Sequence, residues 1–327
     1  MRILVIRLSS LGDIVLTQPI LAELRNSYPE AEIVFLTKRE FAPLPDMFGL
    51  DLRTAIYDKR LLWHLKLASE SFDLVIDLHA KTSSWLVKTL VKGQQKASYD
   101  KQRRIRSSIV KGNRTLSVES TIRLYQSALD KIFPDAGRES SPLPFPRLEL
   151  SNAKMVDLDL PQRDLEKKLA GVFVGAAHAT KAYPAEQWTD LIRMAQETHE
   201  FWLLGSVAEQ ALADNVCDGI PGVYNLCGRF NIPSLARVID RCDAIISGDT
   251  GPMHMGAALG RPQVVIYGGT HPRLGFRPLN SKAKILCADL DCQPCSLHGS
   301  ERCPLGHLDC MRQIKPQQVY EALLNLA

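Results

Sequence analysis

The sequence predicts an α/β fold with two Rossmann-like halves that face each other across a cleft. Runs of apolar and β-branched residues, such as Ile3–Ile6 and Gln263–Tyr267, have the length and composition of strands buried in a parallel sheet. Helical segments separate these runs, so strand and helix alternate. A proline-rich polar stretch at 134–146 interrupts the alternation, which then starts again. We therefore expect domains at 1–150 and 151–327, and the last helix is a candidate to pack back on the first domain.

Each half is expected to hold the elements of a doubly wound sheet. In the first half we predict strands at 3–6, 32–36, 54–57, 73–78 and 96–99, and helices at 13–27, 61–69, 83–91 and 119–133. In the second half we predict strands at 171–175, 201–204, 223–226, 244–247 and 263–267, and helices at 185–199, 207–217, 232–241, 252–259 and 316–326. Ligands of such sheets bind at the carboxyl ends of the strands, so the strand-to-helix turns are where we look for functional residues.

Composition excludes several classes of protein. The 327 residues are 45% hydrophobic with a net charge of +4, which is unlike a disordered chain and gives no reason to expect a nucleic-acid partner. No apolar run approaches the roughly 20 residues of a membrane span, and the N-terminus lacks a signal-peptide pattern, so we predict a cytoplasmic protein. The basic stretch 96–114 is either a solvated loop or a contact for an anionic substrate or lipid headgroup. Its candidate acceptor-binding residues are Lys101, Arg103, Arg104 and Arg106.

Several common catalytic motifs are absent from the sequence. No G-x-G-x-x-G follows the first strand and no G-x-x-x-x-G-K-[ST] occurs, which argues against an ordinary NAD enzyme and a P-loop NTPase. Neither G-x-S-x-G nor H-E-x-x-H is present.

The first strand-to-helix turn, at 7–13, carries Asp13. Asp13 is either a partner for the positive end of a helix dipole or a general base at the mouth of the cleft. Ser9 and Ser10 could cap the helix or bind a ligand oxygen.

A second turn, at 247–254, precedes a helix that begins near Pro252. Thr250 and Gly251 would present free backbone N–H groups, which suit a diphosphate, and Gly251 would allow a close approach. His254 could donate a hydrogen bond to a phosphate oxygen. Asp249 could instead be a simple helix cap.

The third turn, at 175–184, contributes His178, Thr180 and Lys181. Lys181 beside a helix N-terminus would make a metal-free clamp for a leaving pyrophosphate, although a solvated lysine is the alternative. His178 could contact a ligand or pack in the core.

Four cysteines cluster near the C-terminus as C-x2-C-x7-C-x6-C, and these are Cys292, Cys295, Cys303 and Cys310. This pattern is compatible with a structural zinc or iron, with reduced packing thiols, or with disulfides. We expect no catalytic metal.

These turns, taken in order, resemble glycosyltransferase family 9, the bacterial heptosyltransferases of lipopolysaccharide core synthesis. The resemblance rests on R-L-S-S-L-G-D at 7–13, T-K-A-Y-P-A-E-Q-W at 180–188, S-G-D-T-G-P-M-H-M-G-A-A-L-G-R-P at 247–262 and I-Y-G-G-T-H-P at 266–272. It implies a GT-B fold and an inverting, metal-independent transfer of L-glycero-D-manno-heptose from ADP-heptose. The implied acceptor is the anionic Kdo- or heptose-bearing lipid A core, which implies a place at the inner face of the inner membrane.

The resemblance also implies a role for individual residues. Asp13 matches the catalytic base, and Lys181 matches the lysine that contacts the donor phosphates. The remaining positions expected to bind the donor are Ser9, Ser10, Gly12, His178, Thr180, Asp249, Thr250, Gly251 and His254.

Three alternatives stay open from the sequence. The protein could use another nucleotide sugar, could transfer heptose to a protein, or could bind a nucleotide sugar without catalysis. Asp13 and Lys181 together argue against the last of these, because a binder needs no base.

Overall fold

The computed structural model describes residues 1–138, 141–150 and 159–326. The chain divides into two compact units. Unit 1 comprises Met1–Arg103 and Ser120–Lys154, and unit 2 comprises Arg104–Glu119 and Met155–Ala327. Within the described residues, no helix combines the length and the apolar character that a membrane span requires.

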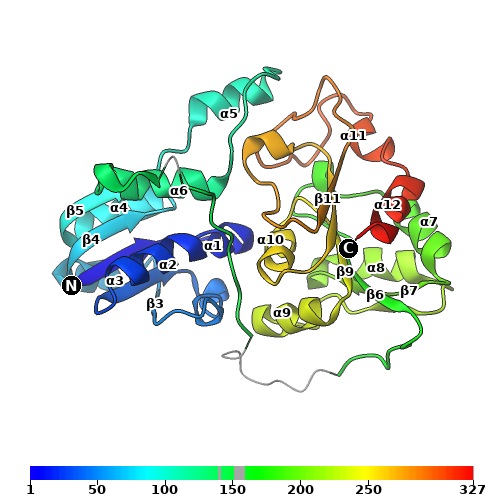
Figure 1. The fold of residues 1–327 in the computed structure, drawn as a ribbon, viewed down its shortest axis with the longest axis horizontal. Coiled ribbons are helices and arrows are strands. Elements are labelled where there is room, and N and C mark those ends of the chain that lie inside the picture. Colours follow the sequence, from blue (N-terminus) through cyan, green and yellow to red (C-terminus); the bar gives the residue numbers. More distant parts are fainter. Residues whose placement is uncertain (139–140, 151–158, 327) are drawn as a thin grey trace. The chain divides into compact units, whose positions relative to one another are not determined.

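Unit 1 is built on a five-stranded sheet in which every pairing is parallel and the strand order is β3-β2-β1-β4-β5. The strands are β1 (Arg2–Ile6), β2 (Glu32–Thr37), β3 (Arg53–Ile56), β4 (Ser71–Asp77) and β5 (Lys92–Ser98). The central strand β1 is almost completely buried because four of its five residues, Ile3 to Ile6, are apolar. Figure 1 shows this sheet in blue to cyan.

The helices of unit 1 cover both faces of this sheet. They are α1 (Leu11–Val15), α2 (Gln18–Ser27), α3 (Leu61–Ser69), α4 (Thr82–Leu90) and α6 (Thr121–Asp130). The strand order reverses direction after β3, so right-handed crossovers place α3 and α4 on the face opposite α2. Helices α3 and α4 contact each other and pack on one apolar cluster that includes Leu4, Val34 and Val87.

Unit 2 contains a six-stranded parallel sheet with the order β11-β10-β9-β6-β7-β8. Its strands are β6 (Lys168–Phe173), β7 (His199–Leu204), β8 (Val223–Asn225), β9 (Ala244–Gly248), β10 (Gln263–Tyr267) and β11 (Ala283–Cys287). Its helices are α7 (Ala185–Ala195), α8 (Gln210–Cys217), α9 (Ile232–Arg241), α10 (Gly251–Ala258), α11 (Asp309–Arg312) and α12 (Pro316–Leu324). The last helix, α12, packs on α7, and its residues Val319 and Leu323 are buried in the core of unit 2.

The two doubly wound parallel sheets confirm the predicted α/β class. The expected boundary at 150/151 meets the start of 151–158, which lies outside the described residues, as do 139–140 of the expected linker. Residues 104–119 differ from the expectation, because the structure groups them with unit 2. Val118 donates its backbone N–H to the Arg273 carbonyl, which ties the end of this segment to the loop after β10.

Several local predictions differ from the structure. Strand β11 was not predicted, and the helix expected at 185–199 ends at Ala195, before β7 begins at His199. The single helix expected at 13–27 is two helices, because Pro19 stands at the start of α2 and has no N–H to continue α1. Strand β5 begins at Lys92, earlier than expected. Its first residues are polar because they lie at the edge of the sheet, so no apolar run marks them in the sequence. The helix α5 (Arg103–Val110) falls inside the stretch that we expected to be a basic loop.

Candidate active site

Asp13 lies in α1, directly after the carboxyl end of β1 in unit 1. Its Oδ2 is 2.5 Å from Nη2 of Arg7, and the Ser10 hydroxyl donates to the same oxygen at 2.9 Å. The Ser10 backbone N–H also points to Oδ2, at 3.3 Å, so Asp13 closes a capping box at the start of its own helix. Asp13 therefore lies at the positive end of the α1 dipole, and its role as a general base stays a prediction.

Arg7 forms an ion pair with the carboxylate of Asp13. Its side chain is only 6% exposed, and it donates from Nε to the Ser9 carbonyl at 2.7 Å and from Nη1 to the Leu78 carbonyl at 2.5 Å. Its guanidinium also lies 5.4 Å from the centre of the Tyr125 ring. Burial is the largest influence on the pKa of Arg7 and acts to lower it, but Asp13, Tyr125 and Tyr99 together outweigh burial, so the pKa is raised and Arg7 stays charged.

The neighbouring strand end at β4 adds buried polar groups beside this pair. Asp77 accepts the backbone N–H groups of His79 and Ala80 at 2.9 and 2.8 Å, which fixes the turn after β4. Burial, together with repulsion from Arg7, lowers the pKa of His79 to about 3, so this imidazole is neutral at physiological pH.

Lys101 reaches the same turn. Its ammonium donates to the Ala80 carbonyl at 2.8 Å, and burial beside Arg103 and Arg7 lowers its pKa to about 8. Of the four basic residues expected to bind an acceptor, Lys101 is therefore the one that lies close to the Arg7–Asp13 pair.

The other three expected acceptor residues, unlike Lys101, lie on α5. Arg103 and Arg104 are exposed. Arg106 is 5% exposed, donates to the Leu274 carbonyl at 3.1 Å and lies 4.7 Å from the centre of the Phe276 ring. Burial therefore gives Arg106 a packing role within unit 2, so its expected contact with an acceptor finds no support.

The candidates expected to bind the donor fall in both units. Ser9, Ser10 and Gly12 surround Asp13 in unit 1, where Ser10 is exposed and Gly12 is buried. The remaining candidates belong to two strand-to-helix turns of unit 2.

In unit 2, Lys181 and Asp249 form an ion pair between these two turns. Lys181 Nζ is 3.0 Å from Asp249 Oδ2, and the two side chains are 15% and 7% exposed. The Thr270 hydroxyl donates to the same Asp249 oxygen at 2.8 Å. Asp249 therefore orients the ammonium of Lys181, while Thr270 helps to hold the carboxylate.

The turn after β9 leads into α10 at Gly251. Thr250 is the N-cap in an extended conformation, and Pro252 occupies the first turn, as the sequence predicted. The backbone N–H groups at the start of a helix have no partner within the helix, and together with the helix dipole they favour an anion. His254 lies one turn further on and is buried.

A close approach of backbones fixes the loop that carries Lys181. Thr180 is 1% exposed, exchanges hydrogen bonds with Ser300, and accepts the Gly269 N–H at 2.7 Å through its carbonyl. A Cβ on Gly268 would lie 2.4 Å from the Thr180 carbonyl oxygen, and one on Gly248 would lie 2.8 Å from that of Lys181. His178 lies at the edge of this loop, where Nδ1 is 3.1 Å from Oε1 of Glu301.

The cysteine-rich segment supports this loop rather than a metal. Among the described residues, no three His, Cys, Asp or Glu side chains gather in a way that could hold a metal ion, and the eight cysteines are free. The expected structural metal at Cys292, Cys295, Cys303 and Cys310 is therefore not supported. Cys295 instead donates its backbone N–H to the Gly269 carbonyl at 3.1 Å, and Cys310 is buried in the core of unit 2.

Sequence reasoning missed three supporting residues. Arg7 stands inside the R-L-S-S-L-G-D stretch, and a charged residue right after a buried strand is a signal that it has a specific partner. Thr270 lies in the 266–272 stretch used for the resemblance, but its contact with Asp249 and that of Ser300 with Thr180 arise only in the tertiary fold.

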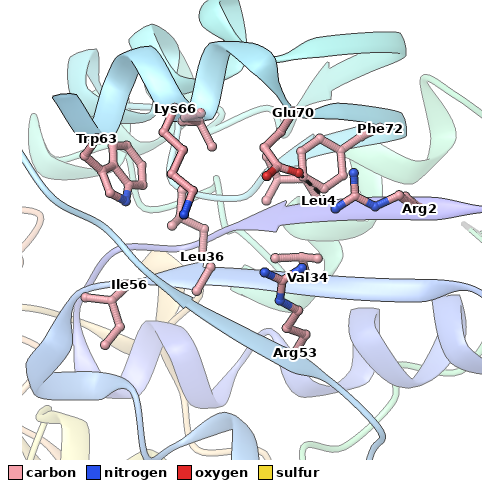
Figure 2. A pocket seen from close by; sticks show the side chains of 12 residues that line it. Arg2, Leu4, Val34, Leu36, Arg53, Ile56, Trp63, Lys66, Glu70 and Phe72 are labelled. Carbon is pink, nitrogen blue, oxygen red and sulfur yellow. Dashed lines mark hydrogen bonds and ion pairs between the residues drawn. The ribbon is translucent and has the colours of Figure 1, made fainter. Parts of the chain in front are cut away.

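Unit 1 also holds a cavity of about 180 Å³ beneath α3. Its floor is apolar, with Leu4, Val34 and Leu36 from the sheet, and Figure 2 shows the Lys66 side chain reaching toward Leu36 from above. Arg2 at its rim pairs with Glu32 and Glu70 at 2.7 and 3.0 Å. The cavity contains none of the candidate catalytic residues.

Comparisons with known proteins identify the family and the fold. The model of the family described as glycosyltransferase family 9 (heptosyltransferase) matches residues 61–305. Lipooligosaccharide heptosyltransferase 2 of Campylobacter jejuni is 25% identical over 97% of this chain and 95% of its own length. The structure of Escherichia coli ADP-heptose lipopolysaccharide heptosyltransferase II superposes with a TM-score of 0.75 at 22% identity, covering 100% of this chain and 98% of that chain. Escherichia coli heptosyltransferase WaaC, solved with ADP-2-deoxy-2-fluoro heptose, gives a TM-score of 0.70 at 21% identity over 100% of both chains.

Proposed function

Since the chain belongs to glycosyltransferase family 9 and has the GT-B fold, we propose that it transfers L-glycero-D-manno-heptose from ADP-heptose to the inner core of lipopolysaccharide. The observation that carries the proposal is that each unit holds one preorganised charged group. Unit 1 offers a carboxylate held by Arg7, and unit 2 offers an ammonium held by Asp249 beside the start of α10. A base and a cationic clamp are the two groups that this transfer needs.

The donor half of the reaction is assigned to unit 2. The WaaC structure holds an ADP-sugar analogue, and the N–H groups at Thr250–Gly251 together with Lys181 suit the diphosphate of such a donor. As the bond between the sugar and ADP breaks, negative charge grows on the leaving phosphate. Lys181 and the positive end of α10 stabilise that charge.

The acceptor half is assigned to unit 1. Asp13 accepts the proton of an acceptor hydroxyl while that oxygen attacks the anomeric carbon on the side opposite to the diphosphate. One displacement of this kind inverts the anomeric configuration and passes through an oxocarbenium-like transition state. Lys101, which lies near the Arg7–Asp13 pair, and the exposed Arg103 are assigned to the anionic groups of the acceptor.

Because the proposed acceptor is a lipid, we also place the protein in the cytoplasm at the inner face of the inner membrane. The catalytic step that we propose uses no metal, since Lys181 and the α10 N–H groups supply the positive charge.

A ligand panel tests the donor first. A nucleotide at about 100 times its dissociation constant stabilises the folded state by about 2.7 kcal/mol, so melting is compared with ADP, UDP, GDP and NAD at about 1 mM each. Stabilisation by ADP alone supports the proposal. Stabilisation by UDP or GDP instead would replace the donor, and a response to NAD alone would overturn the assignment of the 247–254 turn.

A transfer assay then tests the acceptor. Purified protein is incubated with ADP-heptose and Kdo-lipid A, and the product is detected by mass spectrometry. A product heavier by one heptose supports the function. ADP binding without transfer to any lipid A core acceptor would contradict it and favour a protein acceptor or a binding protein.

A further inference from the structure

The surface of α3 and α4 in unit 1 carries large apolar side chains in solvent. Leu62 is 80% exposed, Trp85 58% and Leu86 39%. The two helices contact each other and pack on the same face of the sheet, so these side chains belong to one surface of unit 1. Large apolar side chains gathered on one surface are typical of sites that bind a partner or a membrane.

The sequence of α4 separates a buried face from an exposed one. Ser84, Val87 and Val91 are buried, whereas Trp85 and Leu86 project outward on the other side. Val87 and Val91 pack in the core of unit 1, whereas Trp85 and Leu86 are not part of that core cluster. Trp85 and Leu86, at 58% and 39% exposure, leave much of their apolar surface in solvent rather than in the packing of the sheet.

Lysines lie along α4 and at both of its ends. Residues 78–99 contain four lysines and no Asp or Glu, and these lysines are Lys81, Lys88, Lys92 and Lys96. Lys81 and Lys92 flank α4 and are exposed, whereas Lys88 donates to the Ser98 hydroxyl and Lys96 donates to the carbonyls of Lys88 and Val91. Lys66 on α3 is exposed as well. Exposed apolar side chains beside exposed lysines are complementary to a bilayer that carries anionic headgroups.

The position of this surface relative to Asp13 follows from the topology of unit 1. Helices α3 and α4 begin at the carboxyl ends of β3 and β4, and α1 begins at the carboxyl end of β1 in the same sheet. Leu62 and Trp85 lie in the first halves of their helices, so they lie toward the sheet edge that holds Asp13.

We propose that the α3–α4 surface of unit 1 docks on an anionic lipid bilayer, with Leu62, Trp85 and Leu86 inserted at the level of the headgroups. This inference rests on the proposed function, because a lipid acceptor is what gives docking beside Asp13 its use. Trp favours the boundary between headgroups and acyl chains, where its ring is buried and its N–H stays hydrated. The lysines add attraction that salt weakens.

Vesicle binding tests the proposal directly. Protein is sedimented with phosphatidylcholine vesicles that contain either no anionic lipid or about 30% phosphatidylglycerol. We expect binding to the anionic vesicles only, falling as salt rises. The variant Leu62→Ser/Trp85→Ser/Leu86→Ser should bind at least tenfold more weakly, and Lys81→Gln/Lys92→Gln should bind more weakly and with less dependence on salt.

The control variant is Met194→Ser/Leu324→Ser. Both residues are on helices of unit 2, at 38% and 48% exposure, so this change removes exposed apolar side chains from another part of the protein. It should bind vesicles as the wild type does. Equal loss in the control and in the triple variant would overturn the assignment to α3 and α4.

Tryptophan emission supplies a second readout. Trp188 and Trp202 are 1% and 2% exposed and Trp63 is partly buried on α3, whereas Trp85 is 58% exposed, so we expect Trp85 to give the largest part of a blue shift on adding anionic vesicles. Trp85→Phe should remove most of that shift and retain vesicle binding. A shift of unchanged size in Trp85→Phe, or no binding of the wild type to either vesicle, overturns the proposal. It is also overturned if the wild type is a dimer in solution and the triple variant is a monomer, because the surface would then be a contact between two copies of the chain.

The failure of docking is distinguishable from the failure of the proposed function. Transfer from ADP-heptose is measured in parallel on a water-soluble, de-acylated acceptor, which needs no membrane. The triple variant should retain wild-type transfer to it. Transfer without vesicle binding overturns docking alone, whereas vesicle binding without transfer to any acceptor overturns the function alone.

Discussion

Arg7 and Asp13 form an ion pair in which Nη2 and Oδ2 are 2.5 Å apart, at the carboxyl edge of the unit 1 sheet. Arg7 is buried and is bonded to two backbone carbonyls, so its guanidinium is fixed before any ligand arrives. Asp13 is 23% exposed and remains accessible from solvent. A fixed cation beside a solvent-accessible carboxylate is the arrangement expected of a positioned base.

Replacement of Asp13 tests that assignment. Asp13→Ala should fold, bind ADP as the wild type does, and lose transfer by a factor of about 10² to 10⁴, the usual contribution of a general base. Asp13→Asn keeps the shape of the side chain and should be similarly inactive. Steady-state transfer and calorimetric ADP binding are measured on both variants. Near-normal turnover in either one would contradict the role of Asp13 as the base.

The Lys181–Asp249 pair predicts how the diphosphate is held. Lys181→Ala removes a charged donor and should weaken ADP binding by about tenfold to a hundredfold, because hydrogen bonds to charged groups contribute about 1.5–3 kcal/mol. Lys168, at the exposed start of β6, offers a matched control, since Lys168→Ala removes the same charge from unit 2. Calorimetry with ADP separates the two variants. An unchanged ADP affinity in Lys181→Ala would count against the clamp.

Thr270 predicts an effect that acts through Asp249. Thr270→Val has nearly the same shape but leaves the buried Asp249 oxygen without its 2.8 Å donor, which should cost about 1–3 kcal/mol of unfolding free energy. ADP binding should weaken as well, since Asp249 orients Lys181. Thr270→Ser keeps the hydroxyl and should restore the affinity. Urea unfolding and ADP titration of both variants check this, and equal ADP affinity in the valine and serine variants would show that Thr270 is not a positioning residue.

These residues show where sequence patterns stop being informative. Buried strands such as β1 and β9 and the turn at Thr250–Gly251 were predictable, because apolar runs and a Pro at the start of a helix are local signals. The edge strand β5 was predicted only in part, since its polar residues have no alternation to detect. The Lys181–Asp249 and Thr180–Ser300 contacts join segments far apart in the chain, so only the fold brings them together.

Buried His79 predicts a pH dependence of stability. Unfolded histidine titrates near pH 6.5, whereas burial lowers the pKa of His79 in the fold to about 3. Between these values the unfolded chain binds a proton that the folded protein does not, so the contribution of His79 to stability is lost as pH falls below about 6.5.

Between about pH 7.5 and pH 5, His79→Asn should therefore lose about 2 kcal/mol less unfolding free energy than the wild type. Urea unfolding at both pH values measures the difference, and the value at pH 7.5 corrects for any change in packing. Parallel loss in the two proteins would show that His79 takes up its proton without unfolding.

Two glycines of unit 2 predict opposite outcomes for the same substitution. A Cβ on Gly268 would lie 2.4 Å from the Thr180 carbonyl oxygen, which is backbone and cannot give way without moving the Lys181 loop. A Cβ on Gly256, inside α10, would have its nearest contact at 3.6 Å, an ordinary packing distance. Gly256→Ala should be neutral or stabilise the helix by about 0.5–1 kcal/mol, because Ala favours a helix over Gly.

Gly268→Ala should instead destabilise unit 2 and weaken ADP binding, since it displaces the loop that aims Lys181 at the phosphates. Overpacking of this kind costs about 1–3 kcal/mol. Thermal unfolding with and without ADP compares the two variants, and Gly256→Ala shows that any loss is not a general effect of adding a methyl group near the site. Wild-type stability together with wild-type ADP affinity in Gly268→Ala would mean that the loop has room to move, and that its close backbone contact does not position Lys181.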